Sequence, residues 1–140
     1  MVHHVLIRLG AQEFVDIAAD VKKSEGDDQL ARHAKWVQRA HPDKRITYLI
    51  EGLPRYLEIQ KTKMVRIQKK RLLGEAGDEA EAAIPEEDAA RMRVTKKKLD
   101  SAAVWLQVNM KFHIRMTKDV AESSLYVLRL TTAIANAPYR

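Results

Sequence analysis

The chain of 140 residues contains no cysteine and no long hydrophobic run. Without cysteine it can form neither disulfides nor thiolate metal sites, and this is in keeping with an intracellular compartment. No segment approaches the roughly 20 apolar residues of a membrane-spanning helix, and no signal peptide opens the chain. We therefore expect one intracellular domain with its own core and no membrane partner.

The charge is strongly positive. The formal net charge is +6 and the isoelectric point is about 9.6. Such a balance favours anionic partners, nucleic acid before others. It does not by itself establish DNA binding.

Apolar patterning predicts strands that alternate with helices. Residues 5–9 and 46–51 are β-branched runs that end at Gly10 and Gly52, and residues 111–116 alternate apolar with polar side chains. Apolar residues at helical spacing predict five helices. They cover residues 11–21 and begin after Asp27 or Asp28, at Pro54, after Thr95 and at Asp119. This order predicts an α/β fold with a mainly parallel sheet flanked by helices. Three strands are few, so we expect the domain to be truncated at one or both ends.

A charged segment interrupts this pattern. Residues 61–71 hold six cations and no acid, and residues 75–88 hold seven acids and no base. Because few large apolar side chains occur there, burial would not offset the ordering entropy, and we expect a mobile insertion at about 60–93.

Two groups of cations are candidates for DNA contacts. The first lies in the charged segment and the second at a predicted helix start, where cations oppose the helix dipole. They are Lys61, Lys63, Arg66, Lys69, Lys70 and Arg71 in the first group, and Lys96, Lys97 and Lys98 in the second. Phosphate contacts by these residues would give affinity without sequence readout. A solvated helix extension or a nuclear-localisation-like cluster remains an equal alternative for the first group. Aromatic residues do not interleave either group, so single-strand stacking is not indicated there.

The last predicted helix is apolar around most of its circumference. A helix of this kind is buried on two sides, and in a small domain the second side favours another subunit over a missing element of the same chain. We expect the interface to include Leu125, Tyr126, Leu128 and Ile134.

A metal-dependent nuclease needs several carboxylates that converge at strand ends. Arg8 is the only polar residue of the first strand, so this strand supplies none. Glu13, Asp16 and Glu51 are weak candidates, because no spacing motif brings them together and each has a simpler interpretation as a surface or turn residue. The histidines are isolated, and no nucleophile motif surrounds the serines.

The sequence resembles the nuclease-like domain of XPF-type structure-specific endonucleases. The strings KKLDSAAVWLQV and DVAESSLYVLRLTTAIANAPYR carry the resemblance in the C-terminal third, and ITYLIEG and VLIRLGAQEFVDIA carry it earlier. Within the family it is most similar to the non-catalytic subunit of the crossover junction endonuclease, the essential-meiotic-endonuclease (Mms-four) type. The resemblance implies a restriction-endonuclease-like fold and a nuclear location.

The departures from the family pattern are informative. Active members carry Gly-Asp, then Glu-Arg-Lys, then Asp three residues further on. Here Leu6-Ile7-Arg8 or Ile7-Arg8-Leu9 stands in place of Glu-Arg-Lys. The resemblance therefore implies a subunit without catalytic residues or bound cofactor, paired with a catalytic homologue that holds Mg²⁺ and cleaves flaps, forks and nicked Holliday junctions in recombination, repair and meiosis. The helix-hairpin-helix motifs of the family are absent from residues 1–140. The alternatives are an active homodimeric nuclease using Glu13, Asp16 and Glu51, and a plain DNA-binding module.

Overall fold

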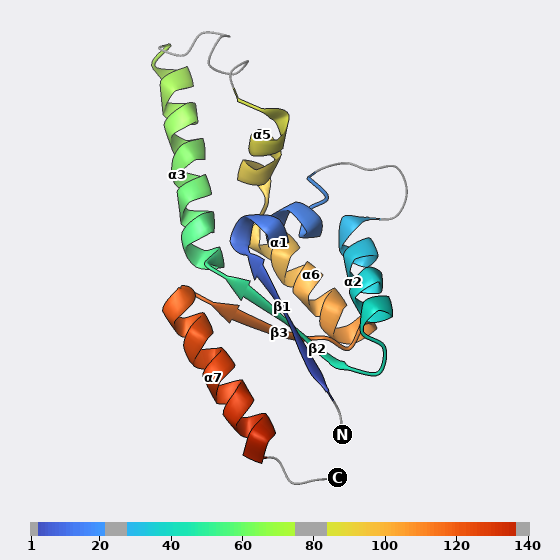
Figure 1. The fold of residues 1–140 in the computed structure, drawn as a ribbon. Coiled ribbons are helices and arrows are strands. Elements are labelled where there is room, and N and C mark those ends of the chain that lie inside the picture. The colour runs from blue at the N-terminus through green and yellow to red at the C-terminus, as the bar shows by residue number, and fades with distance from the viewer. Residues whose placement is uncertain (1–2, 22–27, 75–83, 137–140) are drawn as a thin grey trace.

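The structure, a computed structural model, describes residues 3–21, 28–74 and 84–136. One or more helices separate each strand from the next along the chain (Figure 1). In chain order the elements are β1 (His4–Gly10), α1 (Ala11–Ala18), α2 (Gln29–Ala40), β2 (Arg45–Glu51), α3 (Leu53–Leu72), α5 (Glu86–Arg93), α6 (Lys96–Asn109), β3 (His113–Thr117) and α7 (Val120–Asn136).

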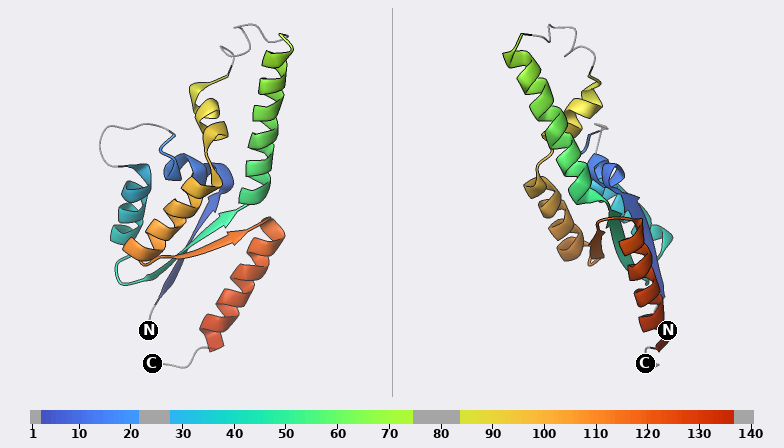
Figure 2. Two further views of the ribbon diagram at one scale, coloured as in Figure 1. Left: turned by 180° about the vertical axis from the view of Figure 1, so that it is seen from behind. Right: turned by 90° about the vertical axis from the view of Figure 1, so that its left-hand side faces the viewer.

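The strands form a parallel sheet in the order β1-β2-β3. Leu9 pairs with Ile50 in register, and Ile50 pairs with Met116. Helices α1, α2 and α6 cover one face, and α7 lies on the other (Figure 2). The predicted α/β class with a parallel sheet and flanking helices is confirmed.

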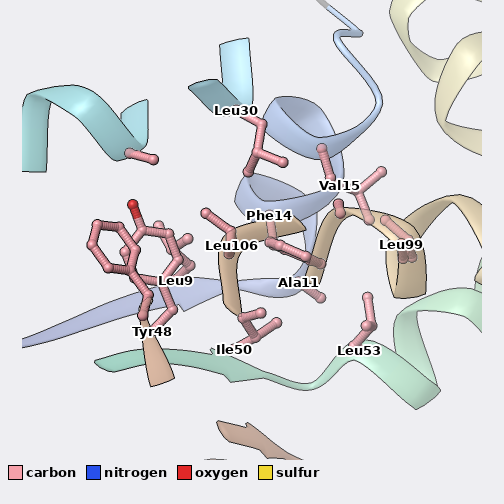
Figure 3. Packing of buried hydrophobic residues seen from close by; sticks show 14 of the residues in the cluster. Leu9, Ala11, Phe14, Val15, Leu30, Tyr48, Ile50, Leu53, Leu99 and Leu106 are labelled. Atoms are coloured by element: carbon pink, nitrogen blue, oxygen red, sulfur yellow. The ribbon is translucent and has the colours of Figure 1, made fainter. Parts of the chain in front are cut away.

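The main core lies under α1, α2 and α6. Alternate residues of the central strand, Ile46, Tyr48 and Ile50, point into it and meet Phe14 and Leu106 from the helices (Figure 3). This alternation follows from the two-residue period of a strand. Leu49, one residue out of phase, is buried on the opposite face, where α7 packs against β2 and β3.

Side-chain caps begin three of the helices, and two of them, Asp28 and Thr95, lie where the sequence predicts a cap. Asp28 accepts a hydrogen bond from the Ala31 amide at 2.8 Å and begins α2, and Thr95 accepts one from the Lys98 amide at 3.2 Å and begins α6. Asp119 accepts one from the Glu122 amide at 2.8 Å at the start of α7. Each bond satisfies an amide that has no partner within its helix.

Several helices and strands begin or end at residues other than those predicted. Helix α1 ends at Ala18 instead of residue 21, and β3 begins at His113. Within the charged segment α3 continues to Leu72, and residues 86–93 form α5, which packs beside α3. The sequence pattern predicts neither α5 nor the residue at which α3 ends. Residues 75–83 lie outside the described residues, and the mobility of the insertion stays a prediction.

Candidate functional site

At the carboxyl ends of β1 and β2, a guanidinium group binds a carboxylate. The Nη2 atom of Arg8 donates to Oε2 of Glu51 at 2.7 Å, although the two residues are 43 positions apart. The Ser123 hydroxyl and the Arg8 guanidinium hold the pKa of the Glu51 carboxyl below its ordinary value. Glu51 therefore stays ionised at neutral pH, and the charge it carries is balanced by Arg8.

The second acidic candidate is bound elsewhere. Asp16 on α1 forms a two-pronged ion pair with Arg91 on α5, with Oδ1 2.7 Å from Nε and Oδ2 3.0 Å from Nη2. Arg91 also donates to Asp88 at 2.8 Å. The bidentate geometry fixes α5 against α1. Sequence reasoning missed Arg91, because Asp16 is 75 residues away and no local pattern joins them.

Glu13 completes the acidic candidates. Its side chain is exposed on α1, and its charge acts on Arg8, as does that of Glu51. In the part of the chain that the structure describes, no three histidine, aspartate or glutamate side chains are grouped as metal ligands would be. Mg²⁺ takes octahedral oxygen coordination and is anchored by one or two available carboxylates, with waters and substrate phosphates at the other positions. A single carboxylate already bound by a guanidinium fits that requirement poorly.

Apolar side chains flank Arg8 between Val5 and Leu9 of β1. Leu9 is buried in the core and Ile7 packs against it. Leu6 is half-buried, and the Arg8 side chain is exposed. Between Val5 and Leu9, β1 therefore presents no carboxylate.

The first group of cations lies on α3. This helix rises from the end of β2 (Figure 1), and beyond Gln60 it has no fully buried residue. Lys63 and Arg66 line a groove of about 310 Å³, across from Asp88 of α5. Lys61, Lys69, Lys70 and Arg71 are exposed, and the last three belong to the final turn.

The second group of cations lies on a different element. Lys96, Lys97 and Lys98 form the exposed first turn of α6. Lys96 and Lys97 line an open depression of about 460 Å³ together with Asp100, Ser101 and Val104. The two groups therefore present positive charge from separate helices.

Helix α7 is covered on only one side. Ser123 is its one buried residue among those described, and the Ser123 hydroxyl is hydrogen-bonded to Thr117 of β3. Leu125, Leu128 and Ile134 are 44%, 63% and 40% exposed. The ring of Tyr126 is half-buried beneath the Arg115 guanidinium, 5.3 Å from the ring centroid. Among the residues that the structure describes, none covers the second side expected for an apolar helix.

Comparisons with known proteins place the fold in a family. A model of the ERCC4 domain matches residues 5–130, which spans all the described strands and most of α7. A search of well-characterised proteins found no match. In the described residues, no helix combines the length and apolarity needed to cross a bilayer. The match covers most of the chain, together with a parallel sheet flanked by helices, and so the chain belongs to the ERCC4-domain family of XPF-type nucleases.

Proposed function

We propose that this chain is the non-catalytic subunit of a heterodimeric endonuclease that cleaves branched DNA. The observation that carries the proposal is the state of the acidic side chains on and after the strands. Glu51 is bound by Arg8, and Asp16 is bound by Arg91 of α5. Family membership supplies the nuclease context, since ERCC4-domain proteins act on branched DNA and often pair with a homologue.

The catalytic partner would supply Mg²⁺ and the hydrolytic residues. Flaps, forks and nicked Holliday junctions are the proposed substrates, and the nucleus, during recombination and repair and at meiosis, is the proposed location. No cofactor is assigned to this chain. Its contribution would be binding: one surface for the partner subunit and one for the DNA backbone.

The open side of α7 supports the subunit surface. Exposed leucine and isoleucine side chains on a well-formed helix leave apolar area in water, and the removal of such area from water favours association. Leu128 is the most exposed of the predicted interface residues, so it reports on the surface without being needed for the core.

The test is co-purification with the catalytic homologue. Leu128→Asp places a charge in the proposed interface, and we expect pairing to weaken by at least about tenfold because the charge would be desolvated without a partner. Val108→Asp on α6 is the matched control, since Val108 is 65% exposed and Leu128 is 63% exposed. Equal pairing by the two variants would refute the assignment of α7.

A further inference from the structure

A third positive surface carries an exposed aromatic ring. Helix α2 presents Arg32, Lys35, Trp36 and Arg39 at positions i, i+3, i+4 and i+7, and all four are exposed. This spacing places them along one face of the helix. The helix contains no acidic residue between Gln29 and Ala40. These four residues, the α2 stripe, therefore combine three cations with one large ring.

The exposure of Trp36 is unusual. The side chain is 65% exposed, and no other large hydrophobic residue of α2 is among the exposed ones. Surfaces that dock a protein are enriched in tryptophan and arginine, but they are depleted of lysine and keep charged residues away from their core. Here the neighbours along the helix face are cationic. That composition matches a polyanion that also carries flat rings.

The Trp36 ring packs against a second aromatic ring, that of His33. The ring centroid of His33 lies 6.4 Å from that of Trp36 and 5.5 Å from that of Tyr48. Nδ1 of His33 is hydrogen-bonded to the Tyr48 hydroxyl at 2.8 Å, and Tyr48 is fully buried at the centre of the sheet. Contacts between aromatic rings thus connect the exposed Trp36 indole through His33 to the buried Tyr48, and they restrict the position of the indole.

We propose that the α2 stripe binds single-stranded DNA, with a base stacked on Trp36 and the cations along the phosphate backbone. Base–aromatic stacking needs no sequence readout, because every base has a flat face. The inference rests on the proposed function, since branched DNA contains or exposes single strands at its junctions. It assigns that part of the substrate to α2, leaving α3 and α6 as candidates for duplex phosphates.

The experiment measures binding of fluorescently labelled oligothymidylate to the purified full chain. We expect Trp36→Ala to weaken binding by about 5- to 150-fold, which corresponds to one stacked base. Trp36→Phe should recover most of it, because a ring is restored. Gln38→Ala, on the same helix and exposed, is the control and should bind as the unmodified chain does.

A second readout uses the indole itself. In a Trp105→Phe background Trp36 is the only tryptophan, since the chain has two. Addition of oligothymidylate should quench its fluorescence. Unchanged affinity in Trp36→Ala, or no quenching while the oligonucleotide binds, would overturn the proposal.

If Trp36→Ala instead abolished partner pairing and bound the oligonucleotide normally, α2 would be assigned to protein contact. Binding of oligothymidylate through Trp36 by a chain that fails to pair would retain this inference and reject the proposed function.

Discussion

At the scale of single residues, guanidinium groups bind two of the three acidic candidates, Glu51 and Asp16. The pair between Arg8 and Glu51 is partly open to solvent, with 60% of the Arg8 side chain exposed, so it adds little to stability. The pair between Asp16 and Arg91 is different, since those side chains are only 15% and 11% exposed. Shielded, bidentate pairs of this kind are the stronger ones.

Removal of the second pair should therefore destabilise the domain. We expect Arg91→Met to lower the free energy of unfolding by about 1.5–3 kcal/mol, because Asp16 would be deprived of its charged hydrogen-bond donors. Urea unfolding at pH 7 measures the change. Glu86→Ala, at an exposed position of the same helix, should stay within about 0.5 kcal/mol of the unmodified chain. Equal destabilisation in both variants would show that the ion pair does not anchor α5.

At the scale of elements, the sequence predicted those helices, strands and caps that depend on residues close together in the chain. The apolar period located β1, β2 and the helices, and short polar residues located the caps at Asp28 and Thr95. Helix α5 could not be predicted in this way, because its anchor Asp16 is remote in sequence. Similarly, the composition of α7 indicated an apolar helix, but which side meets the sheet depends on Ser123 and Thr117.

The element-scale prediction concerns the last turn of α3. A triple change of Lys69, Lys70 and Arg71 to Ala should weaken binding to forked duplex DNA. It should also reduce the slope of log binding constant against log salt concentration by roughly one unit for each phosphate that the helix no longer neutralises. Binding titrations over a range of salt concentrations measure this. Lys44, Arg93 and Lys118 are exposed on other parts of the chain and, changed to Ala, remove the same formal charge. An equal slope change in both triple variants would show that net charge, and not α3, governs the affinity.

At the scale of the whole molecule, the proposed surfaces lie apart. Helix α3 and helix α7 extend away from each other in opposite directions (Figure 1). A variant of one surface can therefore be assayed for the function of the other. Together with the guanidinium-bound acids, this arrangement supports the proposal that the chain joins a partner to DNA while the partner supplies the hydrolytic chemistry.

The most direct measurement is cleavage of a forked duplex by the purified chain alone, in Mg²⁺, beside the reconstituted heterodimer. The account predicts cleavage by the heterodimer only, and no change in that rate when Glu51→Gln is introduced into this chain. Mg²⁺-dependent cleavage by the isolated chain, abolished by Glu51→Gln, would contradict it and establish an active homodimeric nuclease instead.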